Sequence, residues 1–194
     1  MLNRISRAST KVLLDKNIIL ESKEKVYIYG FEVIYSTMFC YACMLVMGII
    51  CKRIWETLIF LVYFTVIRQA VGGYHASTYR RCFFLTNFVY ILESALSIII
   101  CKDIRATLGV FVLSIIYMYF KAPSPNTHRK VTEERRKKLR ERAILYLIIC
   151  SFSVVTFWVL DLKVVVPVIA STMAVISGMI YINEKGGLKL WQHY

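Results

Sequence analysis

Charged residues are scarce in this sequence, and those present are clustered. Asp, Glu, Lys and Arg make up only 19% of the 194 residues, whereas hydrophobic residues make up 58%, against roughly 45–50% in soluble domains. A soluble domain of this size needs helices with a polar outer face, and the long apolar runs here have no such face. The composition therefore excludes an ordinary soluble domain and favours the membrane class.

The first thirty residues lack a continuous apolar stretch, so we expect no cleaved signal peptide. Charged residues interrupt this segment from Arg4 to Lys25, while apolar residues such as Ile5 and Val12 make it loosely amphipathic. Segment 1–30 is therefore predicted to form a helix on the membrane surface, near anionic lipid head groups. Packing on the protein as a cytosolic extension is an equally good interpretation.

Six cysteines do not indicate a disulfide framework here. Five of them lie inside or at the ends of apolar runs, where cysteine behaves as a small hydrophobic residue: Cys40, Cys43, Cys51, Cys101 and Cys150. The Cys40-x-x-Cys43 spacing is a weak redox motif in this apolar setting, and core packing is the better interpretation. Cys82 differs from the other five because polar residues precede it.

Five apolar runs each have roughly the length needed to cross a ~30 Å hydrocarbon core as a helix: 33–51, 82–101, 104–120, 143–160 and 164–182. A sixth run, 54–71, is weaker because Glu56 and Arg68 bracket its uncharged part. We predict an all-α integral membrane protein with six transmembrane helices in a single polytopic domain, residues 1–194, with the amphipathic segment first.

The distribution of positive charge decides whether 54–71 crosses the membrane. With six spans, 20 of the 25 Lys and Arg residues lie on the side that holds both termini; if 54–71 did not cross, the division would be 16 to 9. Because positive residues concentrate on the cytoplasmic side, the first arrangement is favoured. We therefore predict six spans with both ends in the cytoplasm.

The loop 121–142 combines prolines with a basic run. Pro123 and Pro125 prevent simple helix continuation after Lys121, and Thr132 is a suitable N-cap for the next helix. The basic run begins with Arg135, Arg136, Lys137 and Lys138. It is explained as a topological stop signal and lipid anchor, or as a docking surface for an acidic peptide segment. Nucleic acid is not expected, because much of the basic charge lies against the membrane.

Segment 68–86 contains the residues that could take part in catalysis. A thiol of ordinary pKa, about 8.5, is mostly protonated at neutral pH, so a nucleophilic cysteine needs a base or a positive field. His75 can serve as the base for Cys82, and Arg80 and Arg81 add positive charge. The alternative is that neither residue is catalytic: a histidine at the membrane interface and a cysteine at the start of a helix.

A geometric condition applies to this pair. Seven residues along a straight helix span about 10.5 Å, too far for His75 and Cys82 to form a hydrogen bond. The chain must therefore bend between them, and the Gly72-Gly73 pair is compatible with a non-helical backbone. We predict a looped or re-entrant segment from about 68 to 81.

These residues follow the pattern Arg-x3-Gly-Gly-x-His-Ala-x5-Cys, which begins at Arg68 and ends at Cys82. The pattern resembles the AgrB family of bacterial quorum-sensing peptide processors. The chain length, the six-span layout, the N-terminal amphipathic stretch and the proline-containing basic loop are also similar. The resemblance thus covers the whole chain, and the histidine–cysteine pattern is its specific part.

The resemblance implies a cysteine endopeptidase of the bacterial cell membrane with its active site on the cytoplasmic side. Such an enzyme cuts the acidic tail from an AgrD-like propeptide and forms a thiolactone or lactone ring, without a cofactor. His75 and Cys82 match the family's catalytic positions, and a thioester on Cys82 would be the intermediate. Arg68 and Gln69 could orient the substrate carbonyl or its tail.

Two other classes compete with this interpretation. A small peptide transporter or permease is disfavoured because no matching pair of Gly- or Pro-broken spans is present. A metal enzyme using His75, Cys82 and His128 would rest on three scattered ligands without a motif. Glu93 lies in mid-span, where we expect a packing or dimer role. The small residues Ala170, Ala174 and Gly178 indicate either an internal helix contact or a homodimer seam.

Overall fold

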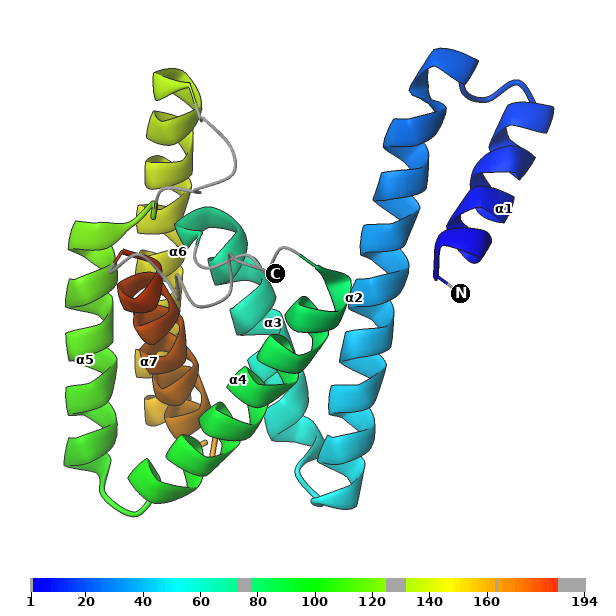
Figure 1. The fold of residues 1–194 in the computed structure, drawn as a ribbon. Coiled ribbons are helices and arrows are strands. Elements are labelled where there is room, and N and C mark those ends of the chain that lie inside the picture. The colour runs from blue at the N-terminus through cyan, green and yellow to red at the C-terminus, as the bar shows by residue number, and fades with distance from the viewer. Residues whose placement is uncertain (1, 73–77, 125–131, 163, 185–194) are drawn as a thin grey trace.

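The computed structural model describes residues 2–72, 78–124, 132–162 and 164–184. Over these ranges the chain consists of α-helices with one short 3-10 turn and no strand, which confirms the predicted all-α class (Figure 1). The helices are α1 (Leu2–Asp15), α2 (Glu24–Ile50), α3 (Ile54–Val71), α4 (Tyr79–Ile100), α5 (Ile104–Lys121), α6 (Glu133–Val159) and α7 (Val165–Glu184). The 3-10 turn covers Glu21–Lys23 and leads directly into α2.

Helices α2 to α7 are each long and apolar enough to cross a membrane, so the prediction of six spans is confirmed. The weakest of the predicted runs forms α3. Its charged ends are accommodated because Arg53 and Glu56 pair at one end and Arg68 lies in the last turn at the other. The chain is a multi-pass membrane protein.

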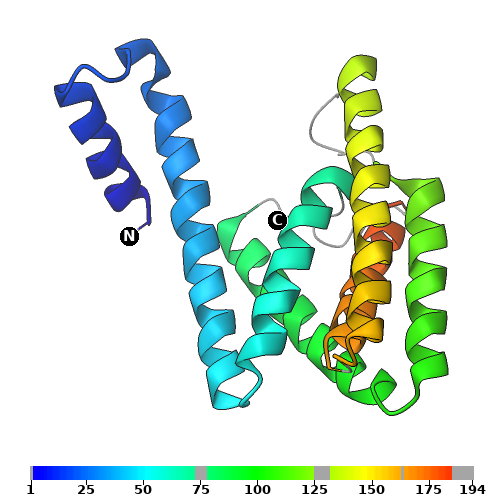
Figure 2. The same cartoon turned by 180° about the vertical axis from the view of Figure 1, so that it is seen from behind.

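Helix α7 is the centre of the bundle. It contacts α3, α4, α5 and α6, and 72% of its most apolar window is buried within the protein. Figure 2 shows α6 and α5 beside it, with α4 crossing near its start. Along its stripe of small residues, Ala170 is fully buried, whereas Gly178 is exposed. At Ala170 the stripe therefore makes an internal helix contact. At Gly178 the homodimer seam stays a prediction.

Helices α1 and α2 form a hairpin at the edge of the bundle. Helix α1 packs along the first half of α2 (Figure 1), where Ser9 and Tyr35 share a hydrogen bond of 2.7 Å between their hydroxyls. Packing on the protein, one of the two predictions for the N-terminal segment, is thus observed, and a position of its outer face near lipid head groups stays a prediction. The same contact explains why α2 begins at Glu24, well before the apolar run that starts near residue 33.

The ends of α3, α5 and α7 and the start of α4 lie at one end of the bundle (Figure 1). Helix α6 rises past this end before its apolar part enters the bundle (Figure 2). At about 1.5 Å per residue, its 27 residues extend roughly 40 Å, more than the hydrocarbon core requires. The extra length is the basic run that begins at Arg135, and Thr132 precedes it in extended conformation.

Candidate active site

Cys82 lies in the first turn of α4. Thr78 is the N-cap of this helix: its side chain accepts a hydrogen bond of 3.3 Å from the Arg81 N–H, and its carbonyl accepts one of 3.0 Å from the Cys82 N–H. The thiol is half-buried. Backbone N–H groups that lack helical partners point toward this end of α4, as at any helix start. The sequence therefore places a cysteine where an anion would meet favourable dipoles.

Thr86 of α4 lies beside this thiol, and Asn87 joins α4 to α2. Thr86 Oγ1 lies 4.0 Å from Cys82 Sγ and donates a hydrogen bond of 2.8 Å to the Cys82 carbonyl. Asn87, the next residue of α4, donates a hydrogen bond of 3.5 Å to Cys40 Sγ of α2. Thr86 follows Cys82 by four residues, a spacing that could have identified it from the sequence. Cys40 could not be identified in this way, because it belongs to another helix.

Arg68 is brought toward Cys82 by the end of α3. Its guanidinium lies over the Phe64 ring, 5.3 Å from the ring centroid, and interacts electrostatically with Cys82, Tyr41 and Cys40. Gln69, the other predicted supporting residue in this turn, is exposed. Both residues are helical, and so are residues 79–81 at the start of α4, so the looped segment predicted for about 68 to 81 is wrong at both of its ends.

Gly72 ends α3 in a conformation that L side chains rarely adopt. Its φ of 81° and ψ of −149° lie in a region that glycine alone occupies readily. A Cβ at this position would also lie 3.0 Å from the Ser124 carbonyl oxygen. The prediction that this glycine interrupts the helix is consistent with this backbone. Gly73 and His75 lie outside the described residues.

Glu32 connects three helices beside the start of α4. Its Oε1 accepts a hydrogen bond of 2.6 Å from Asn3 Nδ2 of α1, and its Oε2 accepts one of 3.2 Å from the Tyr79 hydroxyl. Tyr79 precedes Cys82 by one helical turn, so it lies on nearly the same face of α4. The sequence analysis did not identify this carboxylate, because its two partners belong to other helices and are distant in sequence.

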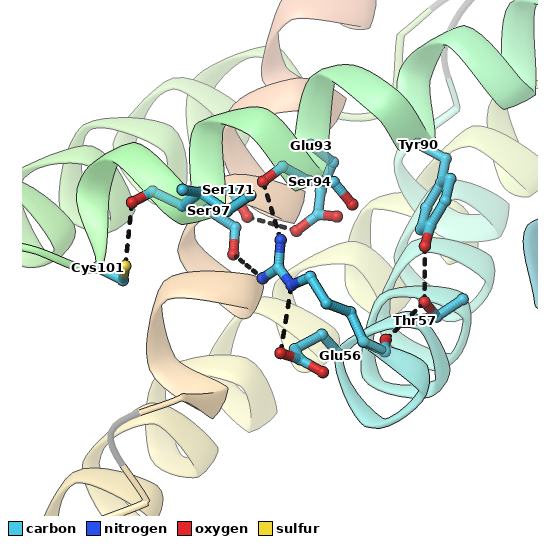
Figure 3. A network of polar contacts seen from close by, with 10 residues as sticks. Glu56, Thr57, Tyr90, Glu93, Ser94, Ser97, Cys101 and Ser171 are labelled. Carbon is cyan, nitrogen blue, oxygen red and sulfur yellow. Dashed lines mark hydrogen bonds and ion pairs between the residues drawn. The ribbon is translucent and has the colours of Figure 1, made fainter. Parts of the chain in front are cut away.

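A polar network holds the other half of α4 (Figure 3). The Arg53 guanidinium donates to the Ser94 carbonyl at 3.2 Å and to Ser97 Oγ at 3.1 Å, and pairs with Glu56 at 3.3 Å. Helix α3 is thereby joined to α4 near the end of the bundle opposite Cys82. These are interhelical polar contacts of the kind that stabilise membrane bundles.

The same network extends to α7 through Glu93. This side chain is buried, and Ser171 Oγ donates a hydrogen bond of 2.6 Å to its Oε1 (Figure 3). Thr57 and Tyr90 share a further bond of 2.7 Å between α3 and α4. The packing role expected for Glu93 agrees with these contacts. Together they fix the position of α4, and hence of Cys82, relative to α3 and α7.

The basic residues Arg135, Arg136, Lys137 and Lys138 are all exposed on the protruding part of α6. They lie on a different part of the bundle from the start of α4 (Figure 1). Among the described residues there is no group of three His, Cys, Asp or Glu side chains arranged to hold a metal ion. His75 and His128, two of the three ligands considered above, lie outside those residues.

Comparison with known proteins places this architecture in a family. The family model for Accessory gene regulator B, AgrB, matches residues 5–182. The chain belongs to the AgrB family. A protein of Clostridium beijerinckii described as AgrB-like is 26% identical over 188 residues, which is 94% of this chain and 92% of that protein. No solved structure matches the chain significantly. Membership of the AgrB family supports a role in accessory gene regulator quorum sensing.

Proposed function

We propose that this protein is a membrane cysteine endopeptidase that converts an AgrD-like propeptide into a cyclic autoinducing peptide. The observation that carries the proposal is the position of Cys82, half-buried in the first turn of α4. Arg68, at the end of α3, is near enough for its positive charge to act on the thiol. His75 is the general base in this proposal, since it belongs to the short segment between Gly72 and Thr78 that joins these two helices.

In the first step, His75 takes the proton of the Cys82 thiol, and the thiolate attacks the carbonyl carbon of the scissile peptide bond. The carbon–nitrogen bond breaks as the imidazolium returns the proton to the departing amine. The acidic tail leaves with a free amino group. The ring-forming part of the peptide remains on Cys82 as a thioester. Arg68 orients the reacting carbonyl or the tail.

In the second step, a thiol or hydroxyl of the peptide attacks the thioester carbonyl. His75 accepts its proton, the carbon–sulfur bond to the enzyme breaks, and Cys82 recovers its thiol as the ring closes. Exchange of one thioester for another is nearly balanced in free energy, so no ATP is needed. Holding the two groups together supplies an effective concentration on the order of 10⁵ M or more in favourable cases, and the membrane setting keeps water away from the thioester.

The orientation and the docking surface follow from charge. Both termini and the Cys82 end of the bundle lie in the cytoplasm in this proposal, because 20 of the 25 Lys and Arg residues then lie on that side. Thiols remain reduced there. The exposed basic run of α6 attracts the acidic tail of the propeptide and holds it while the adjoining segment reaches Cys82.

The proposal is tested by purified variants in liposomes, with propeptide cleavage followed by mass spectrometry. Cys82→Ala and His75→Ala should each abolish both cleavage and ring closure. Cys101→Ala is the matched control, because this exposed cysteine lies at the far end of α4. Cleavage by Cys82→Ala, or loss of activity with a chelator, would contradict the proposal. Export of uncut propeptide by the unchanged protein would favour the transporter instead.

A further inference from the structure

We propose that the outer face of α1 binds anionic phospholipid head groups, and that Glu32 couples this binding to the position of Cys82. The lipid contact concerns a surface that the peptidase chemistry does not use. Its effect on activity rests on the proposed function, so binding and activity are measured separately below.

One face of α1 packs on the protein. Ser6 and Thr10 are fully buried where α1 meets α2. Their hydroxyls donate to the carbonyls one turn earlier, at 3.1 Å to Leu2 and 2.9 Å to Ser6. These two short, internally satisfied side chains let α1 approach α2 closely. The rotation of α1 about its axis is thereby fixed, so the residues on its other faces have a defined direction.

The outward faces of α1 carry a basic stripe beside an apolar one. Arg4, Arg7 and Lys11 are exposed and recur at a spacing of three and four residues, which places them in one row. Ile5 and Val12 form the neighbouring row and are 47% and 52% exposed. The helix contains a single acidic residue, Asp15, at the end away from Asn3.

Cations beside exposed aliphatic side chains match the head-group region of an anionic bilayer. The charges attract phosphate, and the aliphatic groups enter the boundary between head groups and acyl chains. A free phosphate ion would satisfy the cations and leave Ile5 and Val12 in water. A lipid head group accounts for both rows, so we assign the surface to an anionic phospholipid.

The hydrogen bonds of Glu32 connect this surface to the start of α4, where Cys82 lies. Asn3 and Arg4 belong to the first turn of α1, and Asn3 binds one oxygen of Glu32 while Tyr79 binds the other. Hydrogen bonds to an ionised carboxylate are stronger than neutral ones. A lipid that holds the start of α1 therefore also holds Glu32, and with it the turn of α4 that carries Cys82.

Binding is tested on the purified chain in detergent by native mass spectrometry. The probes are phosphatidylglycerol, phosphatidylcholine and inorganic phosphate. Each basic side chain near an anionic surface contributes a factor of about five, so Arg4→Gln/Arg7→Gln should weaken phosphatidylglycerol binding roughly 30-fold. Lys16→Gln/Lys25→Gln removes the same charge from exposed positions off the stripe and should leave binding close to that of the unchanged chain. Equal losses in both double variants, equal binding of the two lipids, or full competition by phosphate would overturn the lipid site.

Coupling is tested in nanodiscs of phosphatidylcholine with and without phosphatidylglycerol. Alkylation of Cys82 by N-ethylmaleimide, read by peptide mapping, should slow severalfold when phosphatidylglycerol is present. Glu32→Ala should bind phosphatidylglycerol normally yet lose this effect, and Glu32→Gln should recover part of it because an amide oxygen still accepts a hydrogen bond. An unchanged alkylation rate in the unmodified chain would overturn the coupling even if the propeptide is cleaved. A lipid-dependent rate without any cleavage would instead contradict the proposed function and leave the coupling intact.

Discussion

The Ser124 backbone N–H donates a hydrogen bond of 2.9 Å to the Val71 carbonyl, which joins the segment after α5 to the last turn of α3. Ser124 is buried, and its Oγ accepts a bond of 2.8 Å from Asn183 of α7. The ends of three helices are therefore tied together at the end of the bundle where α4 begins. Gly72 follows Val71 directly, so its conformation depends on this junction.

Gly72→Ala should destabilise the protein. The new Cβ would lie 3.0 Å from the Ser124 carbonyl oxygen, and the positive φ would be strained, at a cost of about 1–3 kcal/mol. Thermal unfolding in detergent measures the change. Gly30→Ala is the control, because it lies within α2 with open space around it and should be neutral or slightly stabilising. Equal stability of the two variants would contradict the strain at Gly72.

Long apolar runs predicted the fold because the hydrocarbon core demands about twenty apolar residues for each crossing. The same signal could not predict where helices continue outside the membrane. Helix α2 extends back to Glu24, since α1 packs against this part. Helix α3 likewise continues through Arg68 and Gln69, where a loop was expected, until Gly72 ends it.

The candidate site was predictable only where its residues are neighbours in sequence. The Gly72-to-Cys82 motif and the helix start around Cys82 follow from local spacing. The hydrogen bonds from Asn87 to Cys40 and from Tyr79 to Glu32 depend on how α2 packs against α4, which spacing along one helix does not reveal. Glu93 illustrates the intermediate case: its depth predicted a packing role, but its partner Ser171 comes from a distant helix.

Native cysteines test the membrane orientation. Cys51 and Cys101 are exposed at the ends of α2 and α4, opposite the start of α4. A membrane-impermeant maleimide should therefore label both in intact cells, because the charge division places this end outside. Cysteines introduced at Ser77 and Asn126 should react only after the cells are opened. Labelling of either introduced cysteine in intact cells would reject the orientation.

Charge reversal tests the docking role of α6. Replacing Arg135, Arg136, Lys137 and Lys138 by Glu should weaken processing of an acidic-tailed propeptide, and the loss should be largest at low salt because ions screen the attraction. Initial rates at several salt concentrations measure it. The control is Lys102→Glu/Arg105→Glu at the other end of the bundle. If correctly inserted protein with the α6 reversals cleaves normally, the run has only a topological role.

The network of Figure 3 should contribute to stability without taking part in chemistry. Tyr90→Phe removes the bond to Thr57 and should cost about 0.6 kcal/mol, a typical value for one interhelical hydrogen bond in a membrane protein. Arg53→Ala removes contacts to Ser94, Ser97 and Glu56 and should cost more. Thermal unfolding in detergent compares the loss of stability in the two variants. A larger loss from Tyr90→Phe would show that Arg53 does not organise the network.

The central claim is that peptide processing passes through a thioester on Cys82. The most direct measurement is intact-protein mass spectrometry of the purified enzyme mixed with propeptide and quenched in acid at early times. We expect an adduct on Cys82 whose mass equals the propeptide without its tail, and which hydroxylamine removes. His75→Ala should suppress the adduct, and Cys82→Ala should lack it. Rapid cleavage without any adduct, or an adduct of the same mass on another residue, would contradict the mechanism.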